Sequence, residues 1–426
     1  MANQPEIVIT GVGAVSPIGI GKEAFWAALC QQRSGIRRLN LFESSSLRPP
    51  FGGMVADFDP KQYVRPRKSL KVMSREIQLA YTAADLAYAD AGLEERPVDP
   101  ERLGVIFGSD MLPCELPELA GAFQACLVEG KFDFQRWGTM ALSALYPLWL
   151  LKYLPNMPAC HIGIAKDARG PNNSITVADA SSLLALAEAT RVLQRGQAEA
   201  LIVGGSGSQI HPAYLIRMHA AGLSQRSDDP AAASRPFDAL RDGLVLGEGA
   251  GTFIVEARRS AEGRQAPVLA VVRGYASAFE PTSDGELPQG NALRRAIVAA
   301  LSHAGLGPAE IGFVIAHGTS SPEGDRLEAE AIRQTLGDVP VTAPKSYFGH
   351  LGPACGSLET IVSILAFQYG QVPPTLNYQQ PDPQCPIRVI HSRPMPLDRA
   401  TAMILSYTRQ GQAAAVVLEG PGNPAP

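Results

Sequence analysis

The sequence predicts an α/β fold made of two duplicated halves, and three observations support this prediction. Alanine-rich helical segments alternate with short, continuous apolar runs, which is typical of strands covered by helices on both faces. The segment at 83–110 is repeated at 294–320, each time as a helix, the tripeptide Ala-Gly-Leu, a polar link and an apolar strand. A polar segment with glycine and proline, 258–267, separates the two copies. We therefore expect an N-terminal half at 1–262 and a C-terminal half at 263–426.

The helices of the two copies end in the same way. Gly92 and Gly305 each follow an alanine and precede a leucine, and a glycine in this position is suited to end a helix. Proline is frequent at 111–160, an insert in the first half, and at 371–396, so we expect long loops over the core in both places. Strands are expected at the apolar runs 6–15, 104–107, 200–205, 251–257, 268–276, 313–316 and 413–420.

Composition limits the class of protein. The 426 residues are 46% hydrophobic and 18% charged, which is enough to bury a large core. The formal net charge of −4, without a long run of one sign, argues against a nucleic-acid partner. No apolar run has the length of a membrane span, and the N-terminus lacks the features of a signal peptide, so we expect a cytoplasmic protein. The six cysteines form no Cys-x-x-Cys pair, as expected for small residues in a reducing compartment.

The most basic stretch of the chain is RPRKSLK at 65–71. A short basic cluster is usually the solvated start of a helix, and the alternative is a docking patch for an acidic protein. The residues themselves leave both interpretations open. The cations concerned are Arg65, Arg67, Lys68 and Lys71.

A candidate site begins in the segment ITVADASSLLALAEA, 175–189. There a strand-like run leads directly into an alanine-rich helix, with Asp179 at the turn. Such an elbow directs one side chain and the first unpaired N–H groups of the helix into a pocket. The helix dipole stabilises an anion at this end, whether a thiolate, an oxyanion or a carboxylate. As a simpler role, Asp179 is a suitable N-cap for the helix.

Two histidines in glycine-rich loops extend this site. His317 follows a predicted strand, and His350 lies five residues after Lys345. Histidines in such loops can stabilise an oxyanion or an enolate. We expect no metal site, because no acidic residue stands at ligand spacing from the two histidines, and two histidines alone do not complete the coordination of a zinc ion. The loop 235–251 has no evident chemistry, and we expect its charged residues to brace the site: Asp238, Arg241, Asp242 and Glu248.

Five segments spread over nearly the whole chain carry a resemblance to a known family. They resemble the β-ketoacyl-acyl-carrier-protein synthases of the thiolase superfamily, the elongating type of fatty acid and type II polyketide synthesis. The resemblance implies a thiolase-like fold of five layers, α-β-α-β-α, and a dimer. The segments are "VITGVGAVSPIG", "GPNNSITVADASS", "RPFDALRDGLVLGEGAG", "AHGTSSPEGD" and "KSYFGHLGPACGSLE".

The resemblance also implies which residues form the catalytic centre. The family has a nucleophilic cysteine at the elbow, and Asp179 occupies that position here. The two histidines of the family match His317 and His350. Its lysine and the glutamate that accompanies it match Lys345 and Glu359.

Further positions of the family concern the substrate carrier. Thr319 and Ser321 match positions that contact the phosphopantetheine arm of acyl carrier protein, which holds the substrate, and no other cofactor is implied. The basic stretch 65–71 falls where the family docks this acidic carrier. Near its C-terminus the family has a glycine-rich loop with a gating phenylalanine and an oxyanion-hole N–H. Here that loop is "SYTRQGQ", 406–412, with Thr408 in place of the gate.

These departures bear on function. A carboxylate is a weak nucleophile toward a thioester, and the mixed anhydride that it would form is high in energy, so we expect no condensation at Asp179. Cys355 offers no replacement, because the resemblance implies a small packed residue at that position. The preferred hypothesis is a chain-length-factor-like subunit, which forms a heterodimer with a cysteine-bearing ketosynthase.

Two alternatives remain. The chain could be a catalytic variant, either a malonyl-carrier-protein decarboxylase or an Asp179-dependent acyl-processing enzyme. An ionised Asp179 would oppose the decarboxylase, because it repels the malonyl carboxylate and the enolate. The chain could also be a homodimer that only binds acyl carrier protein. A closed, polar pocket around Asp179 favours the chain-length-factor hypothesis, and an open channel to both histidines favours the catalytic variant.

Overall fold

A computed structural model describes residues 5–39, 51–219, 222–282 and 288–422. The helices are α1 (Lys22–Cys30), α2 (Arg75–Asp90), α3 (Leu116–Ala125), α4 (Leu142–Ala144), α5 (Met157–Ala165), α6 (Ser181–Gln194), α7 (Pro212–His219), α8 (Arg258–Gly263), α9 (Asn291–Ala304), α10 (Pro322–Leu336), α11 (Lys345–Phe348) and α12 (Cys355–Tyr369). The main strands are β1 (Ile7–Ser16), β5 (Leu103–Gly108), β8 (Asn172–Ile175), β9 (Ala200–Ser208), β10 (Glu248–Ala257), β11 (Ala270–Phe279), β12 (Phe313–Ile315), β13 (Pro340–Thr342), β17 (Thr401–Tyr407) and β18 (Gln412–Glu419). The short strands are β2 (Gly19–Ile20), β3 (Ile36–Arg38), β4 (Phe51–Gly53), β6 (Leu127–Val128), β7 (Lys131–Phe132), β14 (Gln371–Val372), β15 (Arg388–Val389) and β16 (Met395–Pro396).

The largest sheet shows the duplication directly. Its order is β15-β13-β12-β17-β18-β11-β1-β10-β9-β5-β8, with β2 beside β1. Outward from the centre, β1-β10-β9-β5-β8 makes two antiparallel and then two parallel pairings. The series β11-β18-β17-β12-β13 makes the same pairings in the same order. The predicted α/β fold with two duplicated halves is therefore confirmed, and the halves join where β1 pairs with β11.

Matching glycines in the two central strands explain the close packing of the flanking helices. Both β1 and β11 have a register shift, just before Gly11 and Gly274 respectively. A Cβ atom on Gly11 would lie 2.6 Å from the carbonyl oxygen of Ala87 in α2. A Cβ atom on Gly274 would lie 2.5 Å from the carbonyl oxygen of Ala300 in α9. Each strand thus needs a glycine where its alanine-rich helix crosses it.

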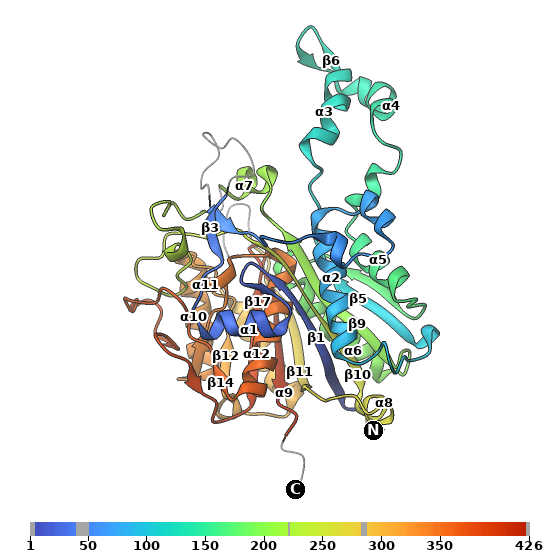
Figure 1. Cartoon of the computed structure of the whole chain (residues 1–426). Coiled ribbons are helices and arrows are strands. Elements are labelled where there is room, and N and C mark those ends of the chain that lie inside the picture. Colours follow the sequence, from blue (N-terminus) through green and yellow to red (C-terminus); the bar gives the residue numbers. More distant parts are fainter. Residues whose placement is uncertain (1–4, 40–50, 220–221, 283–287, 423–426) are drawn as a thin grey trace.

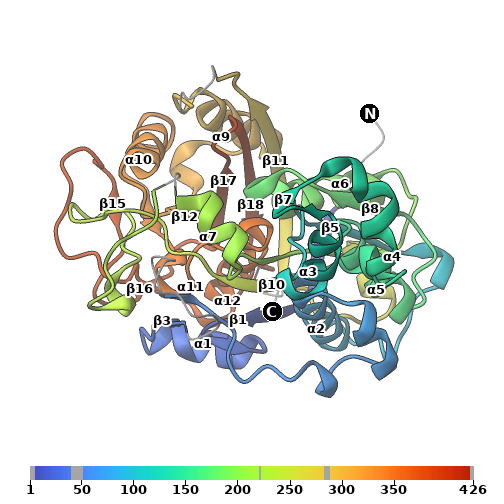
Figure 2. The same cartoon turned by 90° about the horizontal axis from the view of Figure 1, so that it is seen from above.

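The helices form three layers around the two halves of the sheet. On one outer face α2 packs on β1 and β10, and on the other α9 packs on β11 and β18. Figure 2 shows α2 and α5 on the opposite side of the molecule from α9 and α10. Between the halves, α6 and α12 contact strands of both, and Leu183 and Leu358 lie in the same buried cluster. This is the five-layered, thiolase-like arrangement that the resemblance implied.

The insert at 111–160 differs from the prediction of loops laid over the core, which is wrong. It contains α3 and α4 and the hairpin of β6 and β7, and Figure 1 shows this part projecting away from the body. A small buried cluster of Ala122, Cys126, Ala141 and Leu145 holds the projection together. The rings of Phe123 and Phe132 pack against Trp137 but remain exposed. Many of its other apolar side chains are exposed; Phe134 is 75% exposed. An apolar surface of this extent on a projecting element is typical of an interface.

All seven predicted strands are present, while β17, which lies between β12 and β18, was not predicted. The six cysteines are free. None of the helices in the described part of the chain is both long and apolar enough to cross a membrane.

Candidate active site

Asp179 lies at a strained elbow between a strand and a helix. It is the central residue of a 3-10 turn, η7 (Ala178–Ala180), which separates β8 from α6. The residue before it, Ala178, has a φ of +44°, an unfavourable value for any residue with a Cβ atom. The hydroxyl of Ser181 holds the turn, because it accepts the N–H of Val177 at 2.8 Å and donates to the carbonyl of Ala178 at 2.6 Å.

The prediction that Asp179 caps the helix is wrong. The helix α6 begins at Ser181, and its N-cap is Ala180, which makes no side-chain bond. The carboxylate of Asp179 turns instead toward the other half of the molecule, where its Oδ1 lies 2.8 Å from His350 Nε2. The ring nitrogen of His350 was available there, and its interaction with the ionised carboxylate competed successfully with the local N–H groups.

The interaction with His350 sets the charge of the elbow residue. Burial opposes ionisation of Asp179, but the charge and hydrogen bond of His350, with His317 and Lys345, outweigh it and lower the pKa to about 2. Asp179 is therefore a carboxylate at neutral pH. On the other side of the ring, His350 Nδ1 lies 2.9 Å from Gln209 Oε1, which fixes the orientation of the imidazole.

His317, Lys345 and Glu359 form a second buried chain of contacts. Lys345 Nζ lies 2.5 Å from Glu359 Oε1 and 3.1 Å from His317 Nδ1, and it donates to the His317 carbonyl at 2.6 Å. Burial and the charge of Lys345 hold the pKa of His317 well below its usual value, so its ring is neutral. Since Nδ1 accepts from the ammonium, Nε2 carries the proton and can donate to an oxygen. The two histidine rings are 6.0 Å apart, centre to centre.

Two carboxylates of α10, absent from the predicted site, shape the loop that carries His317. Glu328 accepts the N–H groups of His317 and Gly318 at 2.7 and 2.8 Å, and Asp325 accepts the N–H of Thr319 at 3.0 Å. Both acids occupy the buried face of α10, where its other buried residues are apolar. These two residues could have been found from the sequence, because an acidic residue on an otherwise apolar face of a helix indicates a buried polar contact.

Of the loop expected to brace the site, Arg241 reaches it through Asp325, whereas Glu248 binds Arg75 and Asp242 binds Ser224, away from the cavity. Arg241 lies 2.6 Å from Asp382 and 3.8 Å from Asp325, and it is almost completely buried. Asp238 accepts N–H groups of the C-terminal tail, from Gln379 and Gln380, at 2.7 Å each. These contacts tie the tail and the His317 loop to a common support.

The C-terminal loop closes on itself near the histidines. The N–H of Thr408 donates to the Gln412 carbonyl at 2.8 Å, and the N–H of Gln412 to the Thr408 hydroxyl at 3.2 Å. The ring of Tyr407 lies against His317 with centres 4.8 Å apart. Its hydroxyl is buried with no hydrogen-bond partner among the described residues.

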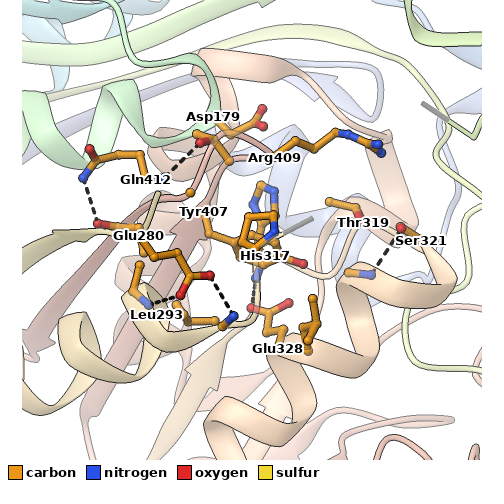
Figure 3. A pocket seen from close by; sticks show the side chains of 18 of the residues that line it. Asp179, Glu280, Leu293, His317, Thr319, Ser321, Glu328, Tyr407, Arg409 and Gln412 are labelled. Atoms are coloured by element: carbon orange, nitrogen blue, oxygen red, sulfur yellow. Dashed lines mark hydrogen bonds between the residues drawn. The ribbon is translucent and has the colours of Figure 1, made fainter. Parts of the chain in front are cut away.

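The predicted substrate-side residues meet in one cavity, shown in Figure 3. Its volume is about 80 Å³. Asp179, whose side chain is only 15% exposed, is part of its lining, which extends to Glu280 and to Leu293 in the first turn of α9. Lys345 and Glu359 lie behind the histidines and do not line it. The lining includes Asp179, His317, Thr319, Ser321, His350 and Thr408.

The basic residues of 65–71 lie apart from this cavity. They belong to an exposed surface segment around the 3-10 helix η2 (Arg67–Val72), immediately before α2. One of them is already engaged, because Arg65 Nη1 donates to the carbonyls of Lys61 and Val64. The docking role therefore stays a prediction.

The fold and the site together define a class. A five-layered, duplicated α/β fold with a nucleophile-type elbow facing two histidines and a buried lysine–glutamate pair is a thiolase-like ketosynthase scaffold. Family models agree: residues 4–261 match the β-ketoacyl synthase N-terminal domain and residues 269–379 the C-terminal domain. The chain belongs to the β-ketoacyl synthase family.

Individual relatives resemble the chain over nearly its whole length. The 3-oxoacyl-[acyl-carrier-protein] synthase 2 of Synechocystis sp. is 35% identical over 90% of this chain and 91% of its own. The tetracenomycin polyketide synthase ketoacyl synthase alpha subunit of Streptomyces glaucescens is 34% identical over 90% and 89%. Among solved structures, the ishigamide ketosynthase/chain length factor matches with a TM-score of 0.85 at 27% identity, covering 99% of this chain and 100% of its own.

Proposed function

We propose that this chain is a non-condensing ketosynthase subunit of the chain-length-factor kind, working in fatty acid or type II polyketide synthesis. One observation carries the proposal: the elbow holds the ionised carboxylate of Asp179, fixed 2.8 Å from His350. Condensation requires a covalent acyl enzyme, and a carboxylate stabilised as an anion has little tendency to attack a thioester.

The loop that faces Asp179 supports the same conclusion. A ketosynthase needs free N–H donors to stabilise the oxyanion of its tetrahedral intermediate. Here the N–H of Thr408 is taken by the Gln412 carbonyl. The cavity is small, at about 80 Å³, but it reaches both His317 and His350 and much of its lining is apolar, so the shape of the pocket does not itself favour this proposal.

We infer that the partner is a cysteine-bearing ketosynthase and that two features form the pairing surface. The strand β8 is the last strand of the large sheet, so one of its edges is free to pair with another strand. The projecting insert exposes large apolar side chains, among them Phe134 at 75%, Leu142 at 58% and Tyr146 at 53%. Obligate interfaces are rich in such residues. The structural match titled ketosynthase/chain length factor is consistent with this pairing.

The proposed substrate is an acyl or polyketide chain on the phosphopantetheine arm of acyl carrier protein, with no other cofactor. Thr319 and Ser321 line the cavity where such an arm would enter. The basic surface around η2 supports docking of an acidic carrier, since its side chains are exposed. A solved ketosynthase with 27% identity and a TM-score of 0.82 is described in complex with its acyl carrier protein.

One observation favours a second candidate, the catalytic variant. The chain from Glu359 through Lys345 to His317 is complete, and it leaves His317 Nε2–H as a donor beside the cavity. This donor could stabilise an enolate, as in a malonyl-carrier-protein decarboxylase, or act with Asp179 in another acyl-processing reaction. The ionised Asp179 weighs against decarboxylation, because it repels the incoming carboxylate.

The test is intact-mass spectrometry of the purified chain with malonyl- and acyl-loaded carrier protein, alone and with the candidate ketosynthase partner. We expect no change of the carriers by the isolated chain, and product only from a stable 1:1 complex. Conversion of malonyl to acetyl carrier by the chain alone, lost in His317→Ala and altered in Asp179→Asn, would overturn the proposal in favour of the catalytic variant.

The pairing surface is tested with the same pair of proteins. Phe134→Ser with Leu142→Ser should abolish the complex in size-exclusion chromatography. Val298→Ser, which changes an exposed apolar residue of α9 outside the proposed surface, is the matched control and should pair normally. A stable homodimer with no affinity for any cysteine-bearing ketosynthase would instead support the carrier-binding homodimer.

A further inference from the structure

Three potential metal ligands of different chemistry meet at the elbow. Asp179 comes from the turn before α6, while His350 and Cys355 flank the 3-10 turn η10 (Gly352–Ala354) that leads into α12. A carboxylate oxygen, a ring nitrogen and the thiol sulfur of these residues all lie within 4.8 Å of one another. His350 and Cys355 are buried, at 4% and 0% exposure.

The distances suit a small tetrahedral ion. Zinc binds carboxylate and imidazole at about 2.0–2.1 Å and thiolate at about 2.3 Å, so its ligand atoms lie roughly 3.3–3.8 Å apart. The pair of Asp179 and His350 would open slightly from 2.8 Å, and Cys355 would approach by about 1 Å. Three protein ligands leave a fourth position, and Asp179 and His350 already line the cavity that a water molecule or substrate oxygen could enter from.

The surroundings of His350 favour a cation at this point. Gln209 Oε1 is an acceptor only, so His350 Nδ1, 2.9 Å away, carries a hydrogen. In the neutral ring, Nε2 then has a lone pair directed at the Asp179 carboxylate, another acceptor, at 2.8 Å. Either a second proton on the imidazole or a metal ion must lie between them. An acceptor held against the far nitrogen is the usual outer-shell partner of a metal-binding histidine.

The other groups permit a dication. Burial raises the pKa of the Cys355 thiol, so a thiolate would form there only on a bound cation, and the N–H of Leu351, 3.1 Å from Sγ, would help to stabilise it. Lys345, whose charge acts on both Asp179 and Cys355, is paired with Glu359 at 2.5 Å. One dication with the Asp179 carboxylate and the Cys355 thiolate adds no net charge to the buried centre. A mixed O, N, S set without excess charge favours Zn²⁺ over Mg²⁺ or Ca²⁺, which bind oxygen.

We propose that Asp179, His350 and Cys355 bind one Zn²⁺ ion, or a similar divalent transition metal, with an open position toward the cavity. The inference is independent of the proposed pairing function, because it concerns the isolated chain. It also assigns a role to Cys355, which lies outside the cavity lining.

Metal uptake tests the proposal on the purified full-length chain. The chain is loaded with Zn²⁺ or Co²⁺, dialysed, and measured by inductively coupled plasma mass spectrometry and absorption spectroscopy. We expect one ion per chain and, with Co²⁺, a thiolate charge-transfer band in the near ultraviolet. Cys355→Ser should abolish the band, and Cys385→Ser, which changes a buried cysteine outside the cluster, should leave it unchanged.

Two further variants separate ligation from folding. Asp179→Asn should weaken metal binding by at least about tenfold, and Gln209→Leu by about 10–100-fold, as for other outer-shell partners. Circular dichroism and thermal unfolding confirm that each variant is folded. Failure of the folded wild-type chain to retain an ion, or a thiolate band that persists in Cys355→Ser, would overturn the proposal. Neither result bears on whether the chain pairs with a ketosynthase.

Discussion

Glu76 provides a test of the electrostatics that needs no knowledge of the substrate. It lies in the first turn of α2 and is only 4% exposed. Its Oε1 contacts the hydroxyls of Ser109 and Ser206 at 3.2 and 3.4 Å. Burial, only partly offset by these hydrogen bonds and reinforced by the nearby charge of Asp110, raises the pKa of Glu76 from its ordinary 4.5 to about 8.

The sign of the resulting pH dependence follows from proton linkage. Between pH 4.5 and 8 the folded chain keeps the proton of Glu76, while the unfolded chain has lost it. The stability associated with the raised pKa is therefore fully present below about pH 4.5 and is lost as the pH rises toward 8. The full shift corresponds to about 5 kcal/mol, at 1.36 kcal/mol per pH unit.

Glu76→Gln keeps the shape of the side chain and removes its ionisation. We expect the free energy of unfolding of the variant, relative to that of wild type, to increase by about 1.4 kcal/mol per pH unit between pH 6 and 8. The assay is urea unfolding at pH 6, 7, 8 and 9, compared as the difference between the two proteins so that other groups cancel. Glu323→Gln, at an exposed position of α10, is the control and should show no such trend. A difference that stays constant with pH would refute the reasoning.

Three other substitutions test the packing and the buried charges, each by the same unfolding assay. Gly274→Ala should lower the free energy of unfolding by about 3 kcal/mol, because the new Cβ atom would lie 2.5 Å from the Ala300 carbonyl oxygen. Its control is Gly263→Ala, which has open space around it and should leave the free energy of unfolding unchanged or raise it by up to about 1 kcal/mol. Equal effects of the two substitutions would contradict the close contact between β11 and α9. Lys345→Met should lower the free energy of unfolding by about 3–5 kcal/mol, because it leaves Glu359 buried without its partner. Adding Glu359→Leu should restore most of this loss, and a double variant that recovers nothing would count against this explanation. Tyr407→Phe should raise the free energy of unfolding by about 1–3 kcal/mol, because it removes a buried hydroxyl that has no hydrogen-bond partner among the described residues, and a loss above about 1 kcal/mol would reveal such a partner.

Most of the fold could be predicted from the sequence, because each half repeats the same local pattern of an alanine-rich helix, an Ala-Gly-Leu turn and an apolar strand. The two Ala-Gly-Leu segments end helices in the same way, and Gly92 and Gly305 both have a φ of +67°. The strand β17 escaped prediction although it is central, because its place depends on pairing with β12 and β18. The insert was mistaken for loops, since its prolines suggested irregular structure and its small core depends on contacts between separate turns.

The site was predictable as far as its motifs extend. The glycine-rich loops of His317 and His350 could be found in the sequence, and the structure brings both into one cavity with Asp179. The prediction that Asp179 caps the helix was wrong because it considered only neighbouring residues, whereas the carboxylate interacts with His350, 171 residues away in the chain. Gln209 and Glu328 carry no motif, and only the fold places one against His350 and the other under the His317 loop.

The retained residues around Asp179 do not by themselves argue for catalysis. Lys345 and Glu359 have side chains only 1% and 0% exposed, and removing either would leave an unpaired buried charge, at a cost of about 3–5 kcal/mol. His317 is joined to the same pair through both its ring and its carbonyl. A centre of this kind is maintained by the stability of the fold even where its chemistry has been lost. The elbow is different, because the side chain of Asp179 is 15% exposed, so its substitution would lower the stability of the fold by less. The carboxylate there, rather than the histidines and the lysine, is therefore the residue on which our proposal of a non-condensing site rests.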